Sequence, residues 1–219
     1  MKDFIELFTI LFSVKFSLAI SFSWKEFKRR LYSDESFLGL KYDLTQELDI
    51  LGPKIPLSIR KQEPRDITNI LNLFDRKLDY QEFRNRLERN LFAKANVPTC
   101  YVAVTEHDVP CAMCWLIYHE DNDKLQGYFN GAIPDLKHGE VLCENIFTHR
   151  DYRGMNLMYH MTMKLFEMAK QKGAQKALAF IRENNLSSLK GSTRIGWEPF
   201  IIKKVKWRFF KRSIIYSNK

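Results

Sequence analysis

The residues best suited to do chemistry lie in the stretch that begins at Glu144. Glu144 stands near the end of an apolar, β-branched segment, residues 141–148, which predicts a strand. A short polar loop with Arg150 and Arg153 follows, and apolar residues then recur at helical spacing over 157–169. A loop that opens into a helix exposes unpaired N–H groups at the positive end of the helix dipole. The pattern therefore predicts a site for a diphosphate close to a carboxylate.

Two blocks, YRGMNLM at 152–158 and NLSSLKGSTRIGW at 185–197, make this prediction more specific. Taken in order with the helix and strand between them, they resemble the GNAT superfamily of acyl-CoA N-acetyltransferases. The first block is similar to the family's pyrophosphate loop, Arg/Gln-x-x-Gly-x-Gly/Ala, with Arg153 in the first position. Asn156 and Met158 stand where the family has small residues. Because Asn tolerates the left-handed conformations that Gly supplies, Met158 is the larger departure.

The second block resembles the family's turn between a strand and a helix, with Asn185 at the characteristic Asn and a Gly-Trp pair at 196–197. In many relatives a Tyr seven residues after this Asn protonates the departing CoA thiolate, and Ser192 occupies that position here. A serine hydroxyl is a far poorer acid than a phenol, whose pKa is about 10. The alternatives to Ser192 are water, another residue such as Tyr152 or Tyr159, or no acid at all.

The resemblance implies acetyl-CoA, or another acyl-CoA, as the co-substrate, and no metal. It assigns the contacts with this co-substrate to the end of the strand, the loop and the second block. The residues are Ile146, Phe147, Thr148, Arg153, Gly154, Met155, Asn156, Leu157, Met158, Asn185 and Ser188.

Glu144 is the predicted general base. Amide formation needs a neutral amine, a group that takes its proton and a donor that holds the oxyanion. By alternation Glu144 shares a strand face with Ile146 and Thr148, and it resembles relatives in which a carboxylate at this point handles the amine proton. The backbone N–H of Ile146 or of Thr148 is the predicted oxyanion donor. The alternative is that Glu144 is an ordinary surface carboxylate of the strand.

The chain as a whole predicts an α/β fold with a mixed, mostly antiparallel central sheet flanked by helices. Its 219 residues, 45% of them hydrophobic, suit one core with an extension. Residues 54–219 are assigned to the GNAT-like acetyltransferase domain and residues 1–53 to an N-terminal extension. Strands are predicted at 56–60, 100–105, 111–118, 141–148, 177–181 and toward the C-terminus, and helices at 66–74, 79–93, 157–169 and 186–193.

The extension contains the most apolar window of the chain, residues 4–24, yet Glu6 and Lys15 argue against a membrane span. Its first half places Phe4, Ile5, Phe8, Leu11 and Phe12 on one helical face. From Phe16 to Trp24 apolar and other residues alternate, which predicts a strand or an extended cover. The extension is predicted to pack on the core. A membrane surface, favoured by the basic run over residues 25–30, and a homodimer interface are the alternatives.

The formal net charge of +9 at pH 7 points to anionic partners, of which CoA is one. Basic and apolar residues alternate over 204–209 and predict a half-buried strand. The sequence contains no nucleic-acid-binding module, so nucleic acid ranks below an anionic glycan, a lipid or a carrier protein. The four cysteines, Cys100, Cys111, Cys114 and Cys143, are predicted to be buried thiols of a cytoplasmic protein, with peripheral membrane contact as a further option.

The predicted function is an N-acetyltransferase that transfers acetyl from acetyl-CoA to a primary amine by direct attack. An amino sugar or other glycan amine, a small polyamine and a peptide amine remain open as acceptors. Family acceptor pockets resemble segments 66–93 and 120–137, where Tyr128, Phe129 and Asn130 are candidate lining residues. The departures from the family motifs leave a second prediction, a GNAT-like fold that binds CoA, acyl carrier protein or a partner without catalysis. A third is a membrane-associated acyltransferase that acts on a glycolipid.

Overall fold

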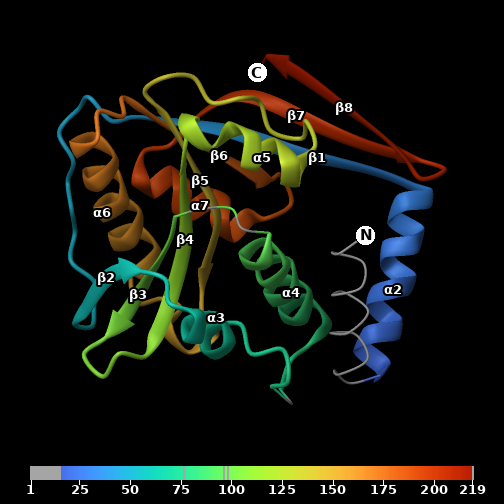
Figure 1. The fold of residues 1–219 in the computed structure, drawn as a ribbon, viewed down its shortest axis with the longest axis horizontal. Helices are drawn as coiled ribbons and strands as arrows, with labels where there is room; N and C mark the ends of the chain where they lie inside the picture. The colour runs from blue at the N-terminus through green and yellow to red at the C-terminus, as the bar shows by residue number, and fades with distance from the viewer. Residues whose placement is uncertain (1–15, 76, 96, 98, 219) are drawn as a thin grey trace.

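Eight strands form one sheet in the part of the chain that the structure describes, residues 16–218 without 76, 96 and 98. The structure is a computed structural model, and its strands follow the order β2-β3-β4-β5-β6-β1-β7-β8 (Figure 1). They are β1 (Tyr32–Asp43), β2 (Leu57–Lys61), β3 (Cys100–Thr105), β4 (Pro110–Tyr118), β5 (Glu140–Thr148), β6 (Lys176–Arg182), β7 (Glu198–Arg208) and β8 (Lys211–Asn218). Neighbouring strands are antiparallel except β5 and β6, which confirms the predicted mixed sheet.

β5 and β6 pair only at their beginnings, where Glu140–Leu142 lies beside Lys176–Leu178. Beyond these residues β5 continues to Thr148 and β6 to Arg182, with no further pairing between them in the described chain. A strand edge without a neighbour has free N–H and C=O groups. The divergence therefore leaves the second half of β5 without a neighbouring strand on its β6 side.

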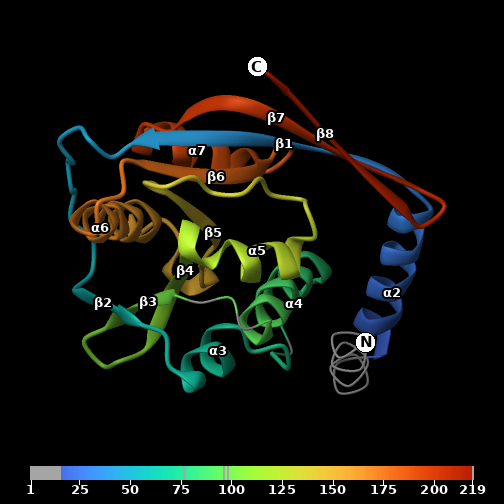
Figure 2. The ribbon, with the colours of Figure 1, turned by 45° about the horizontal axis from the view of Figure 1, so that its top comes forward.

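Helices cover both faces of the sheet. They are α2 (Phe16–Leu31), α3 (Pro64–Ile70), α4 (Tyr80–Lys94), α5 (Asn122–Phe129), α6 (Leu157–Gln171) and α7 (Leu186–Ile195). One core cluster contains Phe166 of α6 and Ile195 of α7, and another contains Phe92 of α4 and Leu125 of α5. Figure 2 shows α4 and α5 together on one side of β1 and β6. The sheet thus separates an α6/α7 face from an α4/α5 face.

Local patterns predicted most elements after residue 56. The predicted hairpin strands 100–105 and 111–118 correspond to β3 and β4, and α4 begins where Asp79 accepts a hydrogen bond from the N–H of Glu82 at 2.8 Å. The helix predicted over 66–74 is shorter in the structure and ends at Ile70. The sequence does not predict α5, whose eight residues, NDKLQGYF, show too few helical repeats.

The strand prediction for Phe16 to Trp24 is wrong, because these residues belong to α2. Over so short a segment, a helix with apolar residues on two sides shows the same alternation of apolar and other residues as a strand. One side of α2 buries Ala19 and Phe22, and the Phe22 ring lies edge-on at 6.2 Å from Phe83 of α4. The helical face predicted within residues 4–12 lies outside the described residues. No helix of the described chain is long and apolar enough to traverse a bilayer.

β1 lies inside the sheet although it comes from the stretch that the sequence assigns to the extension. Phe37–Asp43 pairs with β6 and Tyr32–Lys41 pairs with β7. The sheet therefore takes strands from both sides of the predicted boundary at residues 53 and 54. The residues of β1, YSDESFLGLKYD, alternate too poorly for their sequence alone to predict a central strand.

Candidate active site

The loop between β5 and α6 presents a row of backbone donors. Gly154 and Asn156 both have positive φ angles, 80° and 62°, so Asn156 adopts the left-handed conformation that its residue type tolerates. The Asn156 side chain donates to the carbonyl of Gly52 at 3.2 Å and does not cap α6. Within the described chain the N–H groups of residues 154–158 have no hydrogen-bond acceptor. The loop can therefore donate several N–H groups to an anion at the start of α6.

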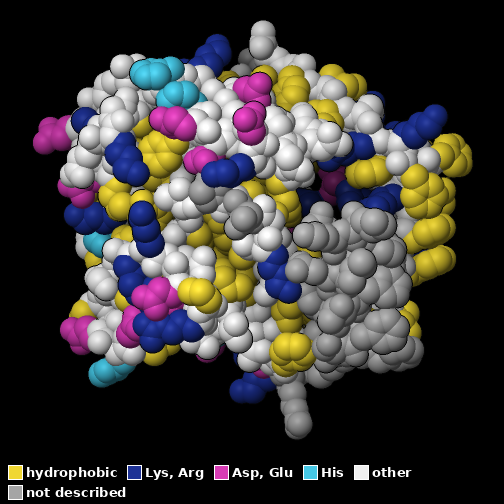
Figure 3. Space-filling view, in the orientation of Figure 1, with side chains coloured by type: hydrophobic (Ala, Val, Ile, Leu, Met, Phe, Trp, Pro, Cys, Tyr) yellow, Lys and Arg dark blue, Asp and Glu magenta, His cyan; other side chains and the backbone are white. Residues whose placement is uncertain are grey.

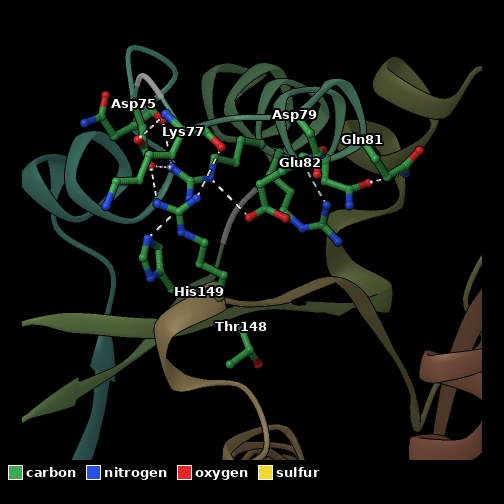
Figure 4. Close-up of polar contacts among 12 residues, drawn as sticks. Asp75, Lys77, Asp79, Gln81, Glu82, Thr148 and His149 are labelled. Carbon is green, nitrogen blue, oxygen red and sulfur yellow. Dashed lines mark hydrogen bonds and ion pairs between the residues drawn. The ribbon is translucent and has the colours of Figure 1, made fainter.

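The two arginines of this loop are already ion-paired with residues near the start of α4. Arg153 Nη2 lies 2.8 Å from Glu82 Oε2, and Arg150 Nη2 lies 2.9 Å from Asp75 Oδ2. Glu82 also accepts from Nε of Arg86, a buried residue, at 3.3 Å. Figure 4 shows this cluster between the start of α4 and the end of β5. Much of the arginine charge beside the loop is thus neutralised within the protein.

His149 follows β5 directly and belongs to the same cluster. Its Nε2 lies 3.3 Å from Nη2 of Arg86, and because a guanidinium only donates, Nε2 is the acceptor of that bond, while Nδ1 lies 3.5 Å from the backbone nitrogen of Asp151. Burial, and next the positive charge of Arg86, lower the pKa of His149. The ring is therefore neutral at pH 7 and serves to anchor the loop (Figure 4).

β5 contains a bulge where it leaves β6. Glu144 lies opposite Trp115 and Phe147 opposite Met113, so residues 145 and 146 together face one residue of β4. The φ angle of Asn145 is 54°, which produces the irregularity.

Arg89 of α4 holds the bulge. It donates to the carbonyl of Asn145 at 3.2 Å and to the carbonyl of Ile146 at 2.9 Å. In a trans peptide the N–H is opposite to the preceding carbonyl, so the N–H groups of Ile146 and Phe147 point away from Arg89. Of the two predicted oxyanion donors, Ile146 thus lies on the bulge itself.

Half-buried Glu144 and buried Lys203 carry opposite charges that interact on the α4/α5 face without forming a direct ion pair. Lys203 of β7 is 5% exposed, donates to the carbonyl of Ala132 at 3.2 Å, and lies 4.2 Å from the Phe37 ring and 4.8 Å from the Phe180 ring. Burial lowers its pKa to about 8 against the opposing charge of Glu144. Burial likewise raises the pKa of Glu144, and Lys203 opposes that rise. Both groups are therefore shifted toward their neutral forms, as expected for groups that exchange protons near neutral pH.

The predicted residues of α6 and α7 lie on the other face of the sheet. Met158 points toward α7, where a Cβ on Gly191 would come within 2.2 Å of the Met158 methyl group. Asn185 begins α7 and accepts from the N–H of Ser188 at 3.3 Å. Met158 is thus accommodated by a small residue, Gly191, on the neighbouring helix.

Ser192 is buried on the α6/α7 face, whereas Glu144 faces α4 and α5. The Ser192 carbonyl accepts from the N–H groups of Gly196 and Trp197 at the end of α7. The hydroxyl of Tyr159 donates to the carbonyl of Asp49 at 2.8 Å. The structure therefore places Ser192 and Glu144 on opposite sides of the diverging strands.

Sequence reasoning misses Arg89 and Lys203. Lys203 lies in a run of alternating residues and shares the parity of the buried Val205, which is a signal that the sequence contains. Arg89 lies on a strongly charged helix, and its role depends on a bulge that no local pattern reveals.

Comparison with known proteins gives a consistent result. The profile of the acetyltransferase (GNAT) family matches residues 70–196, more than half of the chain. No curated protein matches the sequence. The fold is similar to a GCN5-related glucosamine N-acetyltransferase region of a fungal multi-domain β-N-acetylglucosaminidase, with 13% identity, TM-score 0.55, and coverage of 85% of this chain and 22% of that one. It is also similar to a Drosophila protein, with 10% identity, TM-score 0.50, and coverage of 87% of this chain and 57% of that one. At these identities the likeness concerns the fold, and the chain spans only part of the length of either protein.

Proposed function

Because this chain belongs to the acetyltransferase (GNAT) family, we propose that it transfers acetyl from acetyl-CoA to a primary amine by direct attack on the thioester. The observation that carries the proposal is the arrangement along β5 and the loop that follows it. A half-buried carboxylate, a bulge that directs N–H groups away from α4, and a row of loop donors occur within residues 144–158.

We assign the phosphates of the co-substrate to the N–H groups of residues 154–158 at the start of α6. At the edge of β5 that β6 leaves, the carbonyls of Ile146 and Thr148 accept from Arg89 and Arg153, so a co-substrate chain with amide groups is proposed to bind there through the N–H groups of the strand. Asn185 and Ser188 at the start of α7 would contact the same ligand from the opposite side of the gap.

Glu144 is the proposed base. Burial raises the pKa of Glu144, which makes this carboxylate a better proton acceptor, and the positive charge of Lys203 opposes that rise and so favours the ionised form. In the proposed reaction the amine nitrogen bonds to the thioester carbonyl carbon and its proton passes to Glu144. The N–H of Ile146 would hold the oxyanion until the C–S bond breaks. The departing thiolate then takes a proton from water or from the Ser192 hydroxyl.

The acceptor amine is proposed to approach from the α4/α5 face, where Glu144 lies. Figure 3 shows the molecule hollowed over β1 on this face, with basic and acidic side chains around the hollow. Glu35 of β1 and Glu88 of α4 both lie close to Arg182, so carboxylates occur on this face beyond Glu144. Glu35 and Glu88 are both ion-paired with arginines, so they do not distinguish among an amino sugar, a polyamine and a peptide amine as the acceptor.

The proposal is tested by calorimetric titration of the full chain with CoA and with acetyl-CoA, followed by thiol release with a panel of amines. We expect micromolar binding of both ligands and release of CoA that depends on the amine. Binding without release for any amine would replace the enzyme with a CoA-binding protein. Absence of binding would overturn the assignment of the loop.

A further inference from the structure

The outward side of α2 carries an exposed apolar stripe. Ile20, Trp24, Phe27 and Leu31 recur at intervals of four, three and four residues, so they lie on one side of the helix. Their exposed fractions are 52%, 56%, 46% and 37%. Hydrophobic side chains line the outer edge of the molecule where α2 lies (Figure 3). The helix therefore has a second apolar face that the core does not use.

The turn between β7 and β8 extends this stripe with two phenylalanines in an unfavourable conformation. Phe209 and Phe210 form a two-residue loop between the paired residues Arg208 and Lys211, and their φ angles are 46° and 65°. Hairpin turns with two positive φ angles strongly prefer Asn-Gly, because a bulky side chain is strained there. The two rings are nevertheless 77% and 51% exposed. A strained backbone that exposes two aromatic rings does not stabilise the protein, which indicates that these rings have a role in function.

The stripe and the turn form one fixed surface. The N–H of Phe209 donates to the carbonyl of Leu31 at 2.8 Å, and the N–H of Phe210 donates to the carbonyl of Arg30 at 2.9 Å. The rings of Phe27 and Phe210 lie 5.5 Å apart. We call this the aromatic surface, made of Ile20, Trp24, Phe27, Leu31, Phe209 and Phe210.

The charged residues around the aromatic surface indicate which kind of partner it binds. Lys28, Arg30 and Lys211 border it, and none of the three has an ion-pair partner among the described residues. The nearby acids are occupied, since Glu26 pairs with Arg29. A second copy of the chain would bring like charges together, which disfavours self-association. Exposed aromatic rings bordered by free cations are instead the composition that binds the interface of an anionic membrane.

We propose that the aromatic surface binds the chain to an anionic lipid membrane, with the rings in the headgroup region and the bordering cations on lipid phosphates. The β8 edge and α2 lie at one end of the sheet, and the loop before α6 lies toward the other (Figure 1). Binding therefore leaves the candidate active site open. This inference does not depend on the proposed function.

The test is co-sedimentation of the full chain with phosphatidylcholine vesicles that contain or lack phosphatidylglycerol. We expect binding only to the anionic vesicles, and weaker binding at high salt. Of the four tryptophans Trp24 is the exposed one, so its emission should shift to shorter wavelength on binding.

The variant Phe209→Asn/Phe210→Gly supplies the residues that the turn prefers, so the protein should fold at least as well as the parent. Its affinity for anionic vesicles should fall by about 100-fold, because the variant removes two phenylalanine rings and each buried ring contributes about a factor of ten. Phe74→Ser is the matched control, since Phe74 is 64% exposed and lies outside this surface.

Unchanged vesicle binding by the turn variant would overturn the proposal, as would equal binding to neutral and anionic vesicles. A dimer that the turn variant dissociates, together with no vesicle binding, would assign the aromatic surface to a second copy of the chain.

Discussion

Replacing Lys203 with methionine should make the protein more stable and less active. Lys203 is 5% exposed and has no carboxylate within ion-pair distance among the described residues. Its ammonium group makes one hydrogen bond, to the carbonyl of Ala132. Methionine is similar in length and apolar, so it can occupy the same space between the rings of Phe37 and Phe180.

The magnitude follows from the pKa of the buried amine. Folding lowers the pKa of Lys203 from 10.5 to about 8. At pH 7 the amine is charged in both states, so this shift lowers the free energy of unfolding by about 3 kcal/mol. The substitution removes a hydrogen bond worth about 1 kcal/mol. The Ala132 carbonyl keeps a partner, because the hydroxyl of Tyr216 donates to it at 3.0 Å. We therefore expect Lys203→Met to raise the free energy of unfolding by about 2 kcal/mol at pH 7.

The increase in the free energy of unfolding that Lys203→Met causes should become smaller as the pH rises. Between pH 8 and pH 10.5 the unfolded chain holds a proton that folded Lys203 has released, so this residue makes the parent protein more stable as the pH rises. Lys203→Met lacks this contribution. Urea unfolding should show the largest stability difference at pH 7 and a smaller one at pH 10.

The same variant should shift the pH dependence of catalysis. The positive charge of Lys203 opposes the rise that burial causes in the pKa of Glu144, so its removal raises that pKa further. The acid limb of kcat/KM should move to higher pH. Lys204→Met is the matched control, because Lys204 is the exposed neighbour on the other side of β7. A less stable variant at pH 7, or an acid limb that does not move, would refute the role given to Lys203.

Three further predictions concern β5 and its loop. Glu144→Gln should lower turnover by about 100-fold with CoA affinity retained, and unchanged turnover in a thiol-release assay would remove Glu144 as the base. Gly154→Val should weaken CoA binding in calorimetry, because φ is 80° and the position of a Cβ has no protein atom within 4 Å, so the valine fills space needed by the ligand. Unaffected affinity would contradict the phosphate assignment. Arg89→Met removes both hydrogen bonds to the bulge and should lower kcat by about tenfold or more with a smaller effect on CoA affinity; a loss confined to CoA affinity would argue against a role of the bulge in the chemical step.

The elements around the loop could be predicted because their signals are local. The strand over 141–148 and the helix from 157 follow from alternation and from helical spacing, and the structure contains β5 at Glu140–Thr148 and α6 at Leu157–Gln171. The left-handed conformation of Asn156 likewise follows from its residue type. Each of these features depends on neighbours within a few positions along the chain.

The features that could not be predicted depend on contacts between distant residues. β1 is a central strand because β6 and β7 bind its two edges, whereas its own sequence alternates poorly. α2 is a helix because α4 buries one of its two apolar sides, and alternation alone cannot distinguish that arrangement from a strand. Lys203 is buried because α5 and the loop after it cover β7, as its bond to Ala132 indicates. All three features arise only when the sheet and its covering helices have assembled, so no local sequence pattern predicts them.

The ion pairs beside the loop suggest how an anionic ligand is admitted. Arg153 is 51% exposed and shares Glu82 with Arg86, whose side chain is 1% exposed. If Arg153 turns from Glu82 to a phosphate, Glu82 keeps its ion pair with Arg86. The move therefore costs little free energy, because it leaves no buried charge unpaired. In the absence of ligand, Glu82 holds the guanidinium beside the free N–H groups of residues 154–158. We therefore expect Arg153 to be the cation that turns to the phosphates, whereas Arg86 remains fixed in the protein.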